Sequence, residues 1–112
     1  MAWLLRDTTV LASVEIADTL PERLKGLLGR RSIEGVLLLR PARAVHTLGM
    51  RFPIDVAYCA GDGDHLTVLK ARTMKPHRVA APVRRANVVL EAEAGALDRW
   101  GVRAGDCLVV RW

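Results

Sequence analysis

The sequence predicts an α+β protein in which a curved, mostly antiparallel and barrel-like sheet carries one main α-helix packed on it. Three observations lead to this fold class. Short apolar runs are separated by turn residues, one segment has clear helix start and stop signals, and the two kinds of element do not alternate regularly. A chain of 112 residues is long enough for one modest core, so we expect a single domain over residues 1–112.

Six or seven segments have the pattern of short β-strands. Most of them alternate apolar and polar residues, whereas Val36–Leu39 consists of four consecutive aliphatic residues, which is typical of a strand buried on both faces. Residues 61–64 form a turn sequence between two apolar runs, so we expect these runs to pair as an antiparallel hairpin. The expected strands are residues 3–6, 10–16, 36–39, 54–60, 66–71, 87–92 and 107–110.

One segment is predicted to be the main helix. Thr19 and Glu22 have the spacing of a capping box, and Pro21 falls in the first turn, where proline is tolerated. The helix is expected over residues 20–28 and should stop at Gly29. The leucines expected to face the core are Leu20, Leu24, Leu27 and Leu28.

Two further segments are expected to be short or irregular. Lys75-Pro76 and Ala81-Pro82 break the chain between two predicted strands, because proline cannot donate to a sheet. That stretch should therefore be a loop or an edge strand. Residues 95–100 could form one short helical turn closed by Gly101.

Composition indicates a folded protein without a membrane span. Hydrophobic residues make up 51% of the chain and charged residues 26%, and no apolar run approaches the roughly 20 residues that cross a bilayer. Arg6 and Asp7 interrupt the apolar start, which argues against a signal peptide, so a cytoplasmic location is expected. Cys59 and Cys107 both lie in apolar runs and are expected to be reduced thiols in the core.

The positive charge is concentrated in one part of the sequence. The net charge is +5, and no acidic residue occurs between Asp64 and Glu91. Such a local excess should attract anions. No aromatic residue lies in this strip to stack on bases, so nucleic acid is not the expected ligand. The residues of the basic strip are Lys70, Arg72, Lys75, Arg78, Arg84 and Arg85.

Residues 46–55 carry the densest group of functional side chains. An imidazole, a hydroxyl, a guanidinium and a carboxylate surround Gly49 and Pro53, which can bend the chain and bring His46 close to Asp55. An Asp–His pair can act as a general base. Alternatively, His46 caps a strand end and Asp55 binds turn amides. The candidate site residues are His46, Thr47, Arg51, Asp55 and Glu91.

Glu91 is a carboxylate within the apolar run 88–92. If it points inward it needs a partner, such as Arg51 or a cluster of backbone amides; if it points outward it belongs to the solvent face of a strand. The three histidines lie on separate segments without ligand spacing, so we expect no metal site. No glycine-rich phosphate loop follows a strand, and no cofactor is expected.

The order of several weak motifs resembles the domain of unknown function 192 family, a group of small prokaryotic proteins. The resemblance covers nearly the whole chain, and it implies a compact β-rich domain without an established enzyme activity. The matching motifs are Glu22-Arg23-Leu24-Lys25-Gly26-Leu27-Leu28, Val36–Leu39, His46-Thr47-x-Gly49-Met50-x-x-Pro53-Ile54-Asp55, the Gly-Asp-Gly turn, Val89-Leu90-Glu91-Ala92-x-x-Gly95 and Gly101-x-x-x-Gly105-Asp106.

Two functions are compatible with these features. The first is a non-enzymatic binding module in which residues 46–55 and the basic strip form a face for a small anionic ligand or for a protein or peptide partner. The second is a small hydrolase or lyase that uses His46 and Asp55 as an acid/base pair, with Glu91 as a further member. A deep pocket around these side chains would favour the enzyme, and a flat exposed strip would favour binding.

Overall fold

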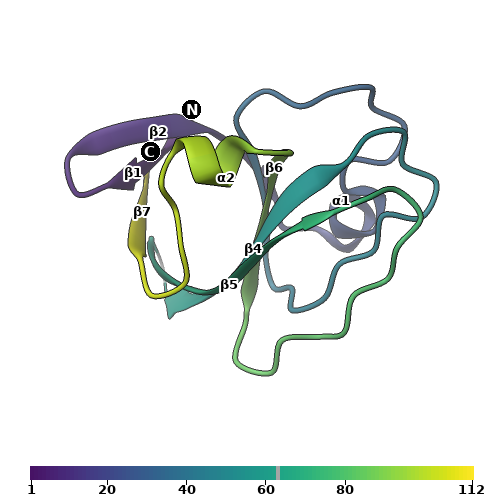
Figure 1. The fold of residues 1–112 in the computed structure, drawn as a ribbon. Helices are drawn as coiled ribbons and strands as arrows, with labels where there is room; N and C mark the ends of the chain where they lie inside the picture. Colours follow the sequence, from purple (N-terminus) through teal and green to yellow (C-terminus); the bar gives the residue numbers. More distant parts are fainter. Residues whose placement is uncertain (63) are drawn as a thin grey trace.

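The alternating strand patterns close into a barrel in the computed structural model, which describes residues 1–62 and 64–112 (Figure 1). Seven strands form the barrel, and two short helices lie beside it. The elements are β1 (Ala2–Arg6), β2 (Thr9–Ala17), α1 (Leu20–Lys25), β3 (Val36–Leu39), β4 (Ile54–Asp62), β5 (His65–Met74), β6 (Val88–Glu93), α2 (Ala96–Arg99) and β7 (Cys107–Arg111).

The strands follow the order β1-β2-β3-β6-β4-β5-β7 around the barrel, and β7 pairs with β1 to close it. Neighbouring strands are antiparallel except β2 and β3, which run parallel with Val14 opposite Val36. Closure gives every described strand a neighbour on both sides. The predicted hairpin is confirmed, because β4 and β5 pair from Ile54–Met74 to Asp62–His65. Its predicted turn includes Gly63, which lies outside the described residues.

The predicted α+β class with one main helix is wrong, because the protein is a closed β-barrel with only 9% helix. The predicted capping box is present, with mutual hydrogen bonds between Thr19 and Glu22. The helix nevertheless ends after six residues at Gly26, whose φ of 50° lies in the left-handed region that favours glycine.

The predicted apolar face of this helix is also wrong. Leu20, Leu24 and Leu28 are 58%, 66% and 40% exposed. Leu27, which follows the helix, is the one of the four leucines that is buried. The apolar side chains near α1 are therefore divided between the core and the surface.

Two apolar clusters hold the fold together. One fills the barrel and includes Leu4, Leu38, Leu90 and Leu108. The other covers the outside of β3, β4 and β6 and includes Leu37, Val56, Tyr58 and Val89. Val36–Leu39 contributes to both clusters, which confirms the prediction that this strand is buried on both faces.

Of the remaining predictions, those for the loop, the short helical turn and Cys59 are confirmed, and the one for Cys107 is wrong. Residues 75–82 form a loop whose one bridge joins Val79 to His46, and the short helical turn is present as α2, as expected. Both cysteines are free; Cys59 is buried as predicted, but Cys107 is exposed, so its placement in the core was wrong. Within residues 1–62 and 64–112, no helix has the length and hydropathy needed to cross a membrane.

Candidate functional site

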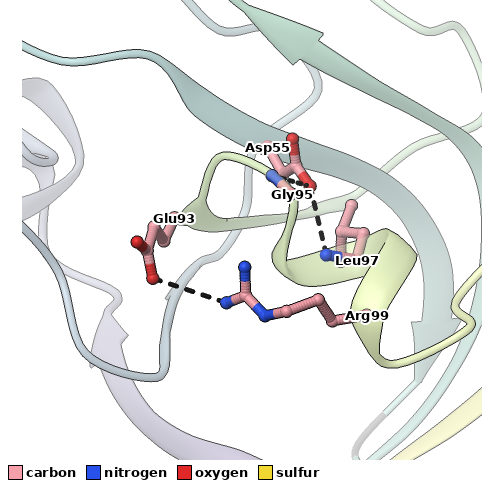
Figure 2. A network of polar contacts seen from close by, with 5 residues as sticks. All are labelled: Asp55, Glu93, Gly95, Leu97 and Arg99. Atoms are coloured by element: carbon pink, nitrogen blue, oxygen red, sulfur yellow. Dashed lines mark hydrogen bonds and ion pairs between the residues drawn. The ribbon is translucent and has the colours of Figure 1, made fainter.

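Asp55 faces the interior of the barrel, on the same side of β4 as Cys59. Its Oδ1 accepts a hydrogen bond from the Thr73 hydroxyl at 2.6 Å. Its Oδ2 accepts from the backbone N–H groups of Gly95 at 3.0 Å and Leu97 at 3.1 Å (Figure 2). These amides belong to the first turn of α2 and have no partner within the helix. Asp55 therefore holds α2 against the barrel.

Thr47 joins two long connections, residues 40–53 between β3 and β4 and residues 75–87 between β5 and β6. Its side chain is fully buried, and Oγ1 donates to the carbonyl of Lys75 at 2.6 Å and accepts from the N–H of Arg78 at 2.9 Å. The backbone N–H of Thr47 also donates to the Arg78 carbonyl at 2.8 Å. We call the two joined connections the loop ribbon.

The loop ribbon lies on the outside of the barrel. Its apolar side chains, among them Val45, Met50 and Ala80, pack in the outer cluster with Val56 and Val89 of the barrel wall. Figure 1 shows these connections gathered on the same side of the molecule as α1. Further backbone hydrogen bonds along the ribbon run from Ala42 to Asn87, from Val83 to Arg43 and from Ala80 to Val45.

Two exposed histidines flank the turn that follows Thr47. The Nδ1 atom of His46 accepts from the N–H of Leu48, and the Nδ1 atom of His77 accepts from the N–H of Gly49, both at 3.3 Å. A neutral imidazole whose Nδ1 accepts a hydrogen bond carries its proton on Nε2. Each ring therefore has a donor left for another group.

The five candidate site residues do not form one cluster. His46, Thr47 and Arg51 belong to the loop ribbon, whereas Asp55 makes its hydrogen bonds inside the barrel. Arg51 is exposed, and no ion pair of the described residues includes it. The two members that do meet are His46 and Glu91, which line one small pocket.

Glu91 points to the outer side of β6, in line with Val89, but it is not on a solvent face. The residue is only 5% exposed, because α1 and its C-terminal connection cover it. The pocket above it has a volume of about 50 Å³. An added Cβ at Gly26 would lie 3.4 Å from Glu91 Oε1, so the backbone approaches the carboxyl closely. The pocket is lined chiefly by Leu24, Leu28, Val45, His46, Leu48 and Glu91.

Burial dominates the electrostatics of Glu91. It raises the pKa of this carboxyl to about 7, against a smaller opposing effect of the Arg30 guanidinium. Oε1 is fully enclosed, and no donor of the described residues lies within hydrogen-bond distance of it. Arg30 does not reach it, because its guanidinium pairs with Glu15 at 2.5 Å. An enclosed carboxyl without a partner is costly, and such groups are uncommon in native proteins.

All six residues of the basic strip are exposed, and none belongs to an ion pair of the described residues. Lys70 and Arg72 lie on β5, and the other four lie in the loop ribbon. The ribbon also contains Arg40, Arg43 and Arg51, so it has seven cationic side chains and no Asp or Glu. Because the whole chain carries +5, the rest of the protein carries a net charge of −2.

Sequence reasoning missed part of this arrangement. The absence of acidic residues from residues 35–54 was a usable signal for Arg40 and Arg43, because it matches the acid-free stretch that contains the basic strip. The pocket walls Leu24 and Leu48 had no comparable signal. They lie far apart in sequence and meet only because α1 folds over the loop ribbon.

Comparison with known proteins places the chain in a family. No curated protein matches it. A solved structure from Sinorhizobium meliloti 1021, provisionally described as a transcription regulator, is 27% identical, with a TM-score of 0.77 over 96% of this chain and 89% of that one. A protein of unknown function from Novosphingobium aromaticivorans DSM 12444 is 18% identical, with a TM-score of 0.72 over 99% of this chain and 83% of that one, which shows a shared fold alone.

The family model agrees with the motif resemblance. The DUF192 model, described as "Uncharacterized ACR", matches residues 3–110. The match covers every strand from β2 to β6 and nearly all of β1 and β7. The chain therefore belongs to the DUF192 family of uncharacterised proteins.

Proposed function

We propose that this protein is a non-enzymatic binding module whose loop ribbon, together with Lys70 and Arg72, attracts an anionic partner. The observation that carries the proposal is the separation of charge. Seven cations and no carboxylates occur in the ribbon, while the rest of the chain is net negative. A surface of one sign concentrates ligands of the opposite sign and speeds their association.

The side chains of the ribbon are available for such a partner. Its four members of the basic strip are exposed and outside any ion pair of the described residues. The Nε2–H groups of His46 and His77 add hydrogen-bond donors to the same surface. Buried Thr47 supports the surface from below by tying the two connections together.

We favour binding over acid–base catalysis. A general base needs a neighbour that orients it, and the hydrogen bonds of His46 and Asp55 lead to different partners on different sides of β4. The distribution of charge along two connections also suits an extended ligand better than a small substrate.

The preferred partner is an acidic segment of another protein. The ribbon has no exposed aromatic side chain for base stacking, and the helices have six and four residues, too short to read a major groove. The description of the Sinorhizobium meliloti protein as a transcription regulator makes DNA the competing ligand. A single assay compares binding of an acidic peptide with binding of DNA.

The test is fluorescence anisotropy with a labelled acidic peptide and a labelled DNA duplex, at about 50 mM and about 200 mM salt. We expect the peptide to bind, with an affinity that falls about tenfold or more at the higher salt. The variant Arg84→Glu with Arg85→Glu should weaken binding strongly, because it reverses two charges in the ribbon.

A matched control separates a local surface from net charge. Arg31→Glu with Arg111→Glu also lowers the net charge from +5 to +1, but both residues are exposed and outside the ribbon. This variant should retain most of the affinity. Equal losses of affinity in both double variants, or an affinity independent of salt, would refute the proposal. Tighter binding of the duplex than of the peptide would identify DNA as the partner.

A further inference from the structure

The pocket beneath α1 contains a hydrogen-bond acceptor that the protein itself does not satisfy. Glu91 lines the pocket and is only 5% exposed, and its Oε1 has no hydrogen-bond partner among the described residues. Buried polar atoms of native proteins nearly always have a partner. An exception in the wall of a pocket indicates a place for a ligand that brings the missing donor.

The two arginines near Glu91 are engaged elsewhere. Arg30 pairs with Glu15. Arg23, which also lines the pocket, donates to the carbonyls of Asp18 at 2.9 Å and Arg40 at 3.4 Å. The carboxyl is thus left with an acceptor atom and no internal counter-ion in hydrogen-bond contact.

The walls of the pocket restrict what can enter. They are mainly aliphatic, with Leu24, Leu28 and Leu48 at least 40% exposed at the opening and Leu27 and Leu39 buried. A volume of about 50 Å³ holds only a few water-sized groups. An aromatic ring is too large for this volume. A phosphate group or another anion would be repelled by the carboxylate of Glu91.

We propose that this pocket binds the ammonium group of an aliphatic amine, with Glu91 as its counter-ion and the exposed leucines around its carbon chain. An ammonium group is compact, has three donors and no acceptor, and so matches an enclosed carboxyl oxygen. Its methylene groups bury against Leu24, Leu28 and Leu48, as long cationic side chains do on apolar surfaces.

Lys25 at the opening weakens the attraction between Glu91 and an ammonium group without reversing it. Lys25 lies at the rim and is exposed, so water and salt screen its repulsion. The contact with Glu91 forms in a water-poor site, where the same charges interact more strongly. The raised pKa of Glu91 fits a carboxyl that awaits a partner, because a bound cation would restore its ionised form.

The amine could be a free small molecule or a lysine side chain of a peptide. Both have the same terminal group and aliphatic chain, so the first experiment uses n-butylammonium and the second a lysine with both backbone ends blocked. Tighter binding of the blocked lysine would identify a peptide as the source, and tighter binding of n-butylammonium would identify a free amine.

The test is an NMR titration of the full, isotope-labelled chain at about pH 8. Because the pKa of Glu91 is about 7, most of its carboxyl is ionised at this pH. We expect n-butylammonium to shift the amide signals of Gly26, Leu28 and Leu48, and n-butanol to bind at least about tenfold more weakly. Glu91→Gln should lose the preference for the amine. Glu93→Gln, an exposed position on the same strand, should keep it.

A second measurement does not depend on any variant. In the unsubstituted protein, saturating n-butylammonium should lower the pKa read from the Glu91 carboxyl carbon, because the cation favours the carboxylate. The proposal is overturned if that pKa does not move, if n-butanol binds as well, or if Glu91→Gln binds undiminished; the pocket then holds water alone. Arg84→Glu with Arg85→Glu should leave amine binding intact. The amine site and the proposed anion-binding ribbon are therefore tested independently.

Discussion

Replacing Glu91 with glutamine should change how the stability of the protein depends on pH. Burial raises the pKa of this carboxyl from 4.5 to about 7 in the folded state. The folded protein therefore holds the Glu91 proton more tightly than the unfolded chain does. As the pH rises from about 4.5 to about 7, the unfolded chain gives up this proton first, so the free energy of unfolding falls; it levels off above that range.

The size of the effect follows from the two pKa values. Each unit of pKa difference corresponds to about 1.4 kcal/mol. Over the whole pH range in which Glu91 titrates, its ionisation therefore changes the free energy of unfolding by about 3 kcal/mol. Between about pH 5 and about pH 8, the change is about 2–3 kcal/mol. Glutamine has nearly the same shape and does not titrate, so Glu91→Gln should be free of this loss.

Urea denaturation at several pH values between about 5 and 8 measures the effect. The other titrating groups are the same in both proteins, so the difference between their unfolding free energies isolates position 91. We expect Glu91→Gln to gain about 2–3 kcal/mol relative to the unsubstituted protein over this range. Glu93→Gln is the control, because Glu93 is exposed and its 3.4 Å ion pair with Arg99 contributes little. Parallel pH curves for Glu91→Gln and the unsubstituted protein would refute the reasoning.

Three other substitutions test the fold around the proposed sites, each by urea denaturation with circular dichroism. Thr47→Val should cost about 1–3 kcal/mol, because it removes a fully buried hydroxyl that bonds the carbonyl of Lys75 and the N–H of Arg78, whereas Thr67→Val at an exposed strand position should cost under about 1 kcal/mol; equal costs would show that these hydrogen bonds do not stabilise the ribbon. Asp55→Asn should cost about 2–4 kcal/mol, because an amide cannot replace both acceptor oxygens, and a loss below about 1 kcal/mol would contradict its role in holding α2. Leu27→Ala should cost about 2–5 kcal/mol and Leu24→Ala under about 1 kcal/mol, and the reverse order would restore the predicted helix face.

The strands were predictable because their signal is local. Val36–Leu39 has the predicted bounds, since four consecutive aliphatic residues can be buried only where both faces of a strand are covered. The start of α1 was also predictable, because Thr19 and Glu22 are three residues apart and bond to each other. These features depend on neighbours in the sequence and on little else.

The end of α1 and its orientation depend on distant parts of the chain. Leucine spacing predicted a helix that continued to Leu28, but Gly26 stops it in a left-handed conformation. The helix lies outside the barrel, where Leu27 is buried and Leu20, Leu24 and Leu28 remain exposed. Helical spacing indicates which residues share a side and does not indicate whether that side is covered.

The candidate site shows the same limit. Sequence proximity suggested that His46 and Asp55 meet, yet the strand periodicity of β4 turns Asp55 toward α2. For Glu91, periodicity correctly placed it in line with Val89, but it could not show that the outer face of β6 is covered by α1 and the loop ribbon. Whether this carboxylate is solvated or buried was decided by residues 23–28 and 39–50, which lie more than forty residues away in the sequence.

The same outer layer creates both proposed sites, and it acts on Glu91 in two opposing ways. The Arg30 guanidinium, which follows α1, favours an ionised carboxyl, whereas the cover of α1 and the loop ribbon removes water from Glu91 and favours the neutral acid. The pKa of Glu91 is raised, so desolvation is the larger effect. Exposed cations act through water and lose most of their influence within about 10 Å, whereas a lost hydration shell has no substitute inside the pocket. A positive surface can therefore attract an acidic partner while the carboxyl beneath it still lacks a cation in direct contact.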